Sequence, residues 1–185
     1  MKVSTALLKR RTIRKFKQLP VDNEMLLELI NYARVAPFAG NIQALKYKII
    51  TDSETRDQIF NNVKWAGYLP KGTPTPDERP PVFIAVLGDT KIKDNFETDA
   101  GAAITSILLG AMDMGLGCCW MGAIRRGAIS TILDLPPHLS LLYVIAVGYP
   151  AEESEECKYE KDQKYFYNEK KVLQVPKLSV KDILI

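Results

Sequence analysis

The chain has 185 residues, of which 46% are hydrophobic and 25% charged, as expected for one soluble globular domain with a substantial core. Its net charge of +3 is too small to indicate a nucleic-acid surface, because basic residues crowd positions 9–17 and form no broad stripe. The 3 cysteines include an adjacent pair and there is 1 histidine, which argues against a disulfide framework and a zinc or iron site, and favours a reducing cytoplasm.

A short helix is expected from Ser4 to Lys9, with Ser4 or Thr5 as its cap. It leads into a basic cluster, interrupted by apolar residues, whose arginines are Arg10, Arg11 and Arg14. Arginine carries a rigid fork of donors that matches phosphate oxygens two at a time, so the cluster is suited to grip a phosphate. A solvated basic helix end and a nucleic-acid patch are the alternatives that these residues alone leave open.

Residues 22–62 are predicted to form two helices and one strand. Asp22 caps the first helix, which presents one apolar face and is ended by Pro37. A strand is expected over residues 47–51 and a second helix over residues 52–62.

The connection over residues 37–43 consists of small and amide side chains. Asn41 and Gln43 can both donate and accept hydrogen bonds, which suits a heterocycle with alternating ring nitrogens and carbonyls. Capping of neighbouring backbone groups in the loop is the alternative interpretation.

The middle of the chain combines a long loop with the most apolar helix. Residues 64–81 are rich in proline, and long loops of this kind are usually functional or mobile. A buried strand is expected over 81–89, followed by a helix over 98–113 that is packed on all sides and approached closely by another helix. A membrane span is rejected, because Asp113 and the glycines that follow it interrupt the apolar stretch.

A strand is predicted within the glycine-rich stretch that begins at Gly115, followed by a helix over 127–133 and a strand over 141–147. Gly115 and Gly117 do not form a dinucleotide-binding turn, because a helix precedes them and a strand follows. They leave backbone amides open to a flat ligand, with plain turn chemistry as the alternative. The adjacent cysteines have no evident base nearby and are interpreted as small buried hydrophobic residues.

Four of these stretches occur in order over roughly residues 4–155. Lys9 to Phe16 is similar to R-R-S-x-R-x-F, and Arg34 to Gln43 resembles A-P-S-A-x-N-x-Q-P-W. Asp99 to Ala103 with Gly115 to Gly122 resembles D-x-G-A-A followed by G-L-G-x-C-W-I-G, and Ile145 to Glu153 resembles I-G-Y-P-A-E-E. These are motifs of the flavin-dependent nitroreductase family. One such motif is weak evidence, whereas four in the same order are strong evidence.

The resemblance implies an α+β fold with a central, mostly antiparallel sheet flanked by helices. It also implies an intertwined homodimer with one FMN at each of two sites across the interface. Residues 1–185 would form a single domain, in which residues 156–185 are a polar C-terminal extension that could wrap the partner subunit.

The family's cofactor contacts can be carried over residue by residue. By similarity, the phosphate and ribityl side of FMN is held by Arg10, Arg11, Thr12 and Arg14. The residues contributed by the other subunit are Pro37, Phe38, Ala39, Asn41 and Gln43. Those along the isoalloxazine are Cys119, Trp120, Met121 and Gly122. For the family's late basic contact to phosphate we choose Lys161, with Lys158 and Lys177 as alternatives.

The resemblance implies an FMN oxidoreductase of the cytoplasm, with no nucleic-acid or membrane partner. NAD(P)H would deliver hydride, and a nitroaromatic, a quinone or a similar small acceptor would take the electrons. No side chain is required as an obligate acid or base, because the flavin carries the redox chemistry. Phe38 stands where the family often has Ser, and Ala44-Leu45 replaces Pro-Trp, which leaves open a non-catalytic flavin-binding or redox-sensing module.

Overall fold

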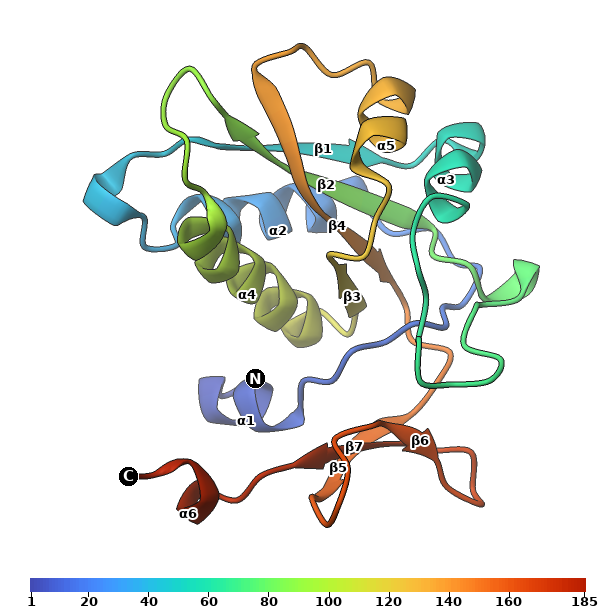
Figure 1. The fold of residues 1–185 in the computed structure, drawn as a ribbon. Helices are drawn as coiled ribbons and strands as arrows, with labels where there is room; N and C mark the ends of the chain where they lie inside the picture. Colours follow the sequence, from blue (N-terminus) through green and yellow to red (C-terminus); the bar gives the residue numbers. More distant parts are fainter.

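The centre of the molecule is an antiparallel sheet of four strands in the order β1-β2-β4-β3, in a computed structural model that describes residues 1–185 (Figure 1). These strands are β1 (Leu45–Ile50), β2 (Val82–Asp89), β4 (Leu139–Gly148) and β3 (Gly117–Met121). All three pairings are antiparallel, which confirms the predicted α+β architecture. The edge strand β3 ends up beside the basic cluster, and this placement determines where the candidate site lies.

The unbroken apolar run of β2 arises because both faces of this strand are covered. Its seven residues from Val82 to Gly88 are all buried. Side chains alternate across a strand, so Ile84 faces the core cluster on one side while Phe83 faces the cluster on the other. The prediction of a fully buried strand over 81–89 is therefore confirmed.

Two pairs of helices form the outer layers (Figure 1). The first core cluster lies between the sheet and the helices α2 (Asn23–Arg34) and α4 (Glu97–Asp113). The second lies between the sheet and the helices α3 (Ser53–Phe60) and α5 (Arg126–Ile132). Asp22 caps α2 as predicted and accepts a hydrogen bond from the Glu24 amide at 2.8 Å. Asp52, which was predicted to lie within the second helix, caps α3 and accepts a hydrogen bond from the Thr55 amide at 2.8 Å.

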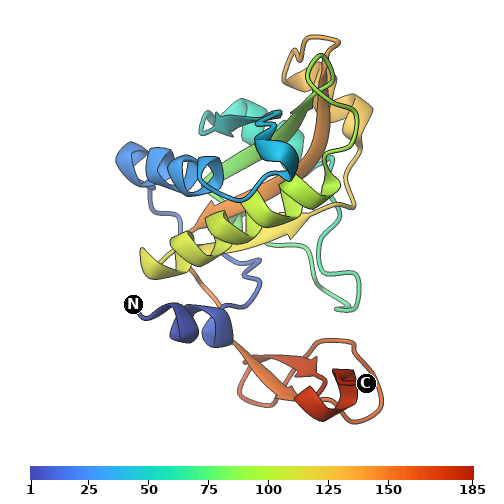
Figure 2. The ribbon, with the colours of Figure 1, turned by 90° about the vertical axis from the view of Figure 1, so that its left-hand side faces the viewer.

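The prediction that α4 is packed on all sides is wrong for the single chain. One face is buried, but residues along the other face are only partly covered, among them Gly101, Ala102, Ser106, Leu108, Leu109 and Met112. Figure 2 shows α4 at the front of the molecule. Gly110 does allow a close helix approach, as expected, but the neighbour is α2: a Cβ at this position would collide with the Tyr32 ring.

The N-terminal helix and the segment after it lie beneath the main sheet (Figure 1). Helix α1 (Val3–Lys9) starts before the predicted Ser4 or Thr5 cap, because Lys2 is its N-cap and no side chain caps it. The next residues run in an extended path between β3 and the chain after β4. The Ile13 amide donates to the Cys118 carbonyl at 2.9 Å, the Lys17 amide donates to the Tyr149 carbonyl at 2.8 Å, and Phe16 is fully buried.

The C-terminal part of the chain forms a small second sheet next to α1 (Figures 1 and 2). Its order is β5-β7-β6, and its strands are β5 (Ser154–Lys158), β6 (Phe166–Tyr167) and β7 (Leu173–Lys177), followed by α6 (Val180–Ile183). Leu173 and Gln174 are buried, so β7 is packed against the chain, whereas residues 178–185 are exposed. The predicted wrapping around a partner stays a prediction.

The other predicted elements are present with small differences in their bounds. Strand β1 begins two residues before Tyr47, and α2 ends at Arg34 instead of reaching Pro37. The stretch 64–81 is loop-like apart from a short 3-10 helix, η2 (Pro76–Glu78), and a similar turn, η1 (Ala39–Asn41), lies in the 37–43 connection. No helix is long and apolar enough to cross a membrane.

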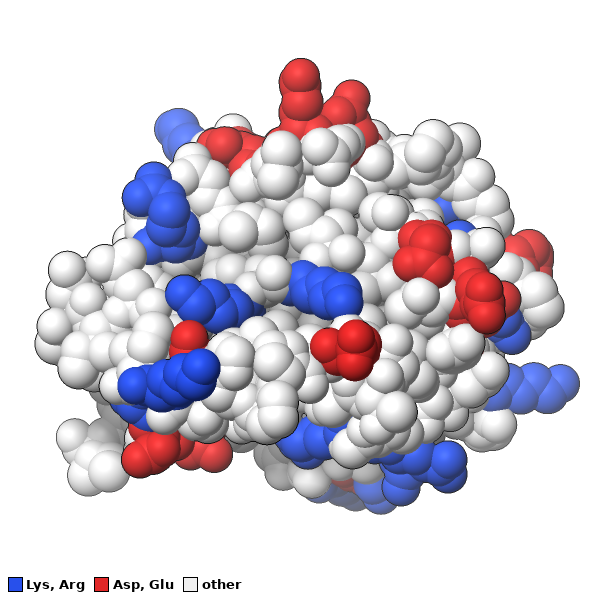
Figure 3. Space-filling view, turned by 90° about the horizontal axis from the view of Figure 1, so that it is seen from above, with Lys and Arg blue, Asp and Glu red and all other residues white.

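Charged side chains are mixed on the upper face of the molecule (Figure 3). Lysine and arginine side chains are separated there by acidic and uncharged surface, and they do not gather into one continuous stripe.

Candidate functional site

The predicted basic cluster crosses the edge of β3 and is held there by its own apolar residues. Ile13 is 8% exposed and packs against Gly117, where a Cβ would lie 2.7 Å from the Ile13 side chain. Glycine at position 117 is therefore required for this close approach. Because Ile13 and Phe16 anchor the segment, the arginines between and before them are held at fixed positions around the β3 edge.

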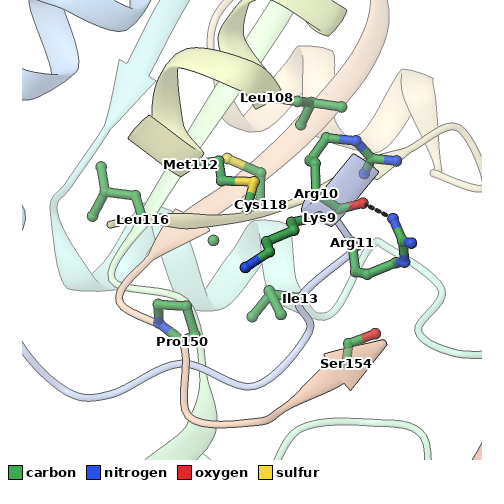
Figure 4. A pocket seen from close by; sticks show the side chains of 11 residues that line it. Lys9, Arg10, Arg11, Ile13, Leu108, Met112, Leu116, Cys118, Pro150 and Ser154 are labelled. Carbon is green, nitrogen blue, oxygen red and sulfur yellow. Dashed lines mark hydrogen bonds between the residues drawn. The ribbon is translucent and has the colours of Figure 1, made fainter. Parts of the chain in front are cut away.

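Arg10 and Arg11 line a small cavity of about 130 Å³ between β3, the C-terminal half of α4 and β5 (Figure 4). We call it the Arg10–Arg11 cavity. Apolar side chains form much of its wall, including Leu108, Met112 and Cys118, whereas Ser154 contributes a hydroxyl from β5. A small hollow with two guanidinium groups at its rim has the charge and size to receive a compact anion.

The polar groups of this cavity are incompletely paired. Arg11 donates from Nη1 to the Arg10 carbonyl at 2.6 Å and from Nη2 to Glu156, but its Nε is buried without a partner. The Ser154 Oγ is also buried without a partner. Burial and the neighbouring charge of Arg11 lower the pKa of Arg10. Unpaired buried donors are rare in folded proteins, and both of these belong to residues that line the cavity.

Arg14 lines a second and larger cavity of about 650 Å³, the Arg14 cavity, in which nine of fourteen lining residues are hydrophobic. Three of the residues predicted to lie along the isoalloxazine also line it: Cys119, Trp120 and Met121. Further walls come from Phe60, Trp65 and the start of the 64–81 loop. The indole nitrogen of Trp65 is buried without a partner. This cavity therefore offers an apolar slot with a cation and a free donor at its margin.

The C-terminal segment closes one side of the Arg14 cavity. The Tyr165 ring lies 4.5 Å from the guanidinium carbon of Arg14 and 5.1 Å from the ring of Tyr68 in the long loop. Tyr165 lines the cavity as well, so it joins the loop and the C-terminal segment across it. The cation–π geometry helps to fix the direction of Arg14.

Glu152 fixes the backbone of the same segment. One carboxylate oxygen accepts hydrogen bonds from the Arg14 amide at 2.5 Å and the Lys15 amide at 3.2 Å, and the other accepts the Tyr167 hydroxyl at 2.8 Å. Burial, followed by this hydrogen bond to Glu152, raises the pKa of Tyr167. Glu152 belongs to the Y-P-A-E-E stretch, but its position alone gave no indication of this role.

The outer edge of β3 is paired only at its start. Thr12 forms an isolated bridge with Cys118, and no strand pairs with β3 beyond that point on this side. The backbone groups of a free strand edge are available to a ligand. Trp120 is 39% exposed and meets Tyr143 edge to face, whereas Gly122 lies past the strand and lines a neighbouring hollow.

The two adjacent cysteines are not nucleophiles. Both are buried, and burial raises the pKa of Cys118 and brings the pKa of Cys119 to about 11. Both therefore remain thiols at neutral pH, as the sequence interpretation requires.

None of the site residues predicted in the 37–43 connection contributes to the wall of either cavity within this chain. The connection is anchored at the other end of α4, where the Ala39 amide donates to Asp99 Oδ1 at 3.0 Å and Lys93 Nζ donates to Asp99 Oδ2 at 2.7 Å. Met112, beside the Arg10–Arg11 cavity, is thirteen residues further along the helix, or roughly 20 Å away. The role assigned to Pro37, Phe38, Ala39, Asn41 and Gln43 therefore needs a second chain.

Lys161 also stays outside both cavities. It is exposed in the connection between β5 and β6. The residues from this region that do reach the cavities are Ser154 and Tyr165. Neither was found from the sequence, because a serine and a tyrosine in a polar tail carry no distinguishing pattern.

Comparisons with known proteins place this chain in a family. The family model described as "Nitroreductase family" matches residues 7–149, which is more than half of the chain. The chain therefore belongs to the nitroreductase family, and the resemblance drawn from the four motifs is confirmed.

Individual relatives agree with this assignment. A Methanothermobacter thermautotrophicus protein, provisionally named NADH dehydrogenase/NAD(P)H nitroreductase, is 30% identical over 82% of this chain and 79% of its own length. The FMN reductase [NAD(P)H] of Bacillus subtilis is 26% identical over 82% of this chain and 67% of its own. The solved structure of an FMN-dependent nitroreductase from Clostridium difficile superposes with a TM-score of 0.70 at 26% identity, covering 85% of this chain and 92% of that one.

Proposed function

We propose that this protein is an FMN-dependent oxidoreductase, which takes hydride from NAD(P)H and passes electrons to a nitroaromatic, a quinone or a similar small acceptor. Family membership and the names of the relatives support this proposal. The observation that carries it is the pair of cavities along one short segment. A small cationic cavity lies beside Arg10 and Arg11, and a large apolar cavity lies beside Arg14.

The residues present fit FMN. The unpaired Arg11 Nε and Ser154 Oγ are suited to phosphate oxygens, and the apolar Arg14 cavity is suited to a flat ring system. Arg10 and Arg11 would hold the phosphate, Thr12 would lie along the ribityl chain, and Cys119, Trp120, Met121 and Gly122 would lie along the ring. When bound, FMN supplies the hydride and electron transfer chemistry that no side chain of the chain can supply.

The contribution of the protein is to bind and orient the cofactor. Arg14 is held by Tyr165 and through its backbone by Glu152, so its charge can stabilise negative charge that develops on a reduced ring nearby. The hydrophobic side chains of the Arg14 cavity give the flat ring an apolar surface to lie against. We assign no side chain as a general acid or base, in agreement with the raised thiol pKa values and with the single histidine of the chain.

We propose further that each complete site spans two chains of a homodimer. The 37–43 connection and the Arg10–Arg11 cavity lie at opposite ends of α4, whose outer face is only partly covered. If two copies pack these faces about a two-fold axis with their helices antiparallel, the connection of one chain lies beside the arginines of the other. This arrangement would bring Asn41 and Gln43 to the partner's cofactor.

The proposed setting is the cytoplasm, since all three cysteines are free and two of them are buried thiols. The proposed partners are NAD(P)H and a small acceptor, with neither nucleic acid nor membrane.

A non-catalytic flavin-binding module is the second candidate function. Phe38, which motivated it, packs against the main core and lines neither cavity of its own chain, so it would bear on the substrate face only across the proposed dimer.

The cofactor is tested by purifying the protein and denaturing it. We expect a yellow protein that releases FMN and not FAD, because the Arg10–Arg11 cavity offers one phosphate grip without a dinucleotide turn. A colourless protein that rejects added FMN in both redox states would contradict the proposal.

A further inference from the structure

Two side chains at the Arg10–Arg11 cavity come from outside the part of the chain that matches the family. The family model ends at residue 149, whereas Ser154 and Glu156 lie on β5. Both residues therefore lie beyond the segment that the family model matches. The role inferred for them rests on the proposed binding of FMN.

Ser154 and Glu156 face the same side of β5. Side chains alternate along a strand, so residues two apart point in the same direction, while Glu155 between them is directed away and accepts a hydrogen bond from Gln174 at 2.8 Å. The shared side is the one that meets Arg11, because Ser154 lines the cavity with it (Figure 4). Glu156 pairs with Arg11 Nη2.

The two partners of this ion pair differ in mobility. The Arg11 side chain is 8% exposed and is held by the Arg10 carbonyl, so its charge stays at the cavity. The Glu156 side chain is 58% exposed and makes no other hydrogen bond or ion pair, so it can move into solvent at little cost. A carboxylate brings one negative charge, whereas a phosphate monoester brings nearly two and has three acceptor oxygens.

We propose that Ser154 is a phosphate ligand and that Glu156 is a counter-ion which an incoming phosphate monoester displaces from Arg11. The phosphate would accept hydrogen bonds from Arg11 Nε and Ser154 Oγ, the two donors that are buried without partners. The same pair makes the site selective, because a flavin without phosphate, such as riboflavin, cannot displace Glu156.

Two variants separate the two roles. Glu156→Gln removes the competing charge, so FMN should bind roughly three- to tenfold more tightly while riboflavin is unaffected. Ser154→Ala removes a donor to a charged ligand, so FMN should bind about tenfold more weakly, again without change for riboflavin. Glu153→Gln is the matched control, since Glu153 is exposed and its side chain makes no hydrogen bond or ion pair.

The experiment measures the affinity of the cofactor-free full-length chain for FMN and riboflavin, and the thermal stabilisation that inorganic phosphate gives to each variant. Inorganic phosphate should stabilise Glu156→Gln more than the parent, and Ser154→Ala less. The proposal is overturned if Glu156→Gln and Ser154→Ala behave like Glu153→Gln with all three probes, or if riboflavin affinity changes in step with FMN affinity. Failure of the parent itself to bind FMN would instead contradict the proposed function, and the phosphate arm would still decide the roles of Ser154 and Glu156.

Discussion

Arg10, Arg11 and Arg14 lie within five residues of one another, yet their guanidinium groups line two different cavities. The extended backbone separates them along its length, since Arg14 lies three residues beyond Arg11, or roughly 10 Å further along the segment. In the proposed site Arg10 and Arg11 hold the phosphate, whereas Arg14, which the resemblance assigned to the phosphate and ribityl side, lies beside the flavin ring.

Replacing Arg10 or Arg14 by Ala should weaken FMN binding. Each variant loses charge-assisted hydrogen bonds worth about 1.5–3 kcal/mol, so the dissociation constant should rise about tenfold or more. Fluorescence titration of the cofactor-free protein measures the change. Arg34→Ala is the control, because the exposed Arg34 donates only to Asn31 on its own helix. If both variants hold FMN as tightly as the control, the phosphate and ring assignments are wrong.

At this scale, the sequence predicted side chains whose chemistry and spacing are distinctive and missed those defined by tertiary contacts. The arginines and Cys119, Trp120 and Met121 were selected from motifs of fixed spacing, and the structure places them at the two cavities. Ser154 and Tyr165 could not, because the fold of the C-terminal segment alone brings them to the cavities. Lys161 was chosen for its charge, and the structure places it in an exposed connection away from both cavities.

Helix α4 connects the two ends of the proposed site. Its first turn holds the 37–43 connection through Asp99, and its last turns line the Arg10–Arg11 cavity. Asp99 is 2% exposed. Burial alone would raise the pKa of Asp99, but the Ala39 amide and Lys93 outweigh it and hold this pKa below the ordinary value.

Asp99→Asn should therefore destabilise the fold at neutral pH. A carboxyl with a lowered pKa stabilises the folded state above its unfolded pKa, roughly 3.9, and this contribution is lost as the pH falls through the folded value. We expect about 1–3 kcal/mol less unfolding free energy at pH 7, and a difference from the parent that shrinks below about pH 4. Denaturant unfolding at several pH values measures it, with the exposed Asp94→Asn as control. If the difference in unfolding free energy between the parent and Asp99→Asn does not change with pH, the ionised Asp99 carboxylate does not have this stabilising role.

The helices and strands and their order along the chain could be predicted from the sequence, because hydrophobic periodicity and helix caps are local signals. The bounds shifted by a few residues where tertiary pairing extends an element, as at the start of β1. The surroundings of α4 could not be predicted, because an apolar helix with small residues looks the same whether its second face meets its own chain or another. Gly110 illustrates this limit, since it packs against Tyr32 within the chain.

At the scale of the whole molecule, a substitution of Gly101 in α4 can test whether the protein forms a dimer. It lies on the partly covered face of the helix, and a Cβ there would meet nothing within 4 Å of its own chain. Gly101→Leu should leave the fold of one chain intact, because Leu favours helix over Gly by roughly 0.8–1 kcal/mol.

In the proposed dimer the same change overpacks the interface by about 1–3 kcal/mol, so dimer affinity and FMN occupancy should fall together. Sedimentation and flavin content on the same samples measure both. Gly127→Leu is the matched control, since Gly127 is also helical and a Cβ there would likewise meet nothing within 4 Å. A parent that sediments as a monomer while fully loaded with FMN would rule out a site that spans two chains.

The central claim is that the chain turns over electrons through bound FMN, and anaerobic titration of the FMN-loaded protein tests it most directly. NADH or NADPH should bleach the flavin absorbance stoichiometrically, and a quinone or nitroaromatic added afterwards should restore it. A flavin that stays bound and oxidised in excess NADH and NADPH, yet is reduced by dithionite, would contradict the enzymatic function and identify the protein as a non-catalytic flavin-binding module.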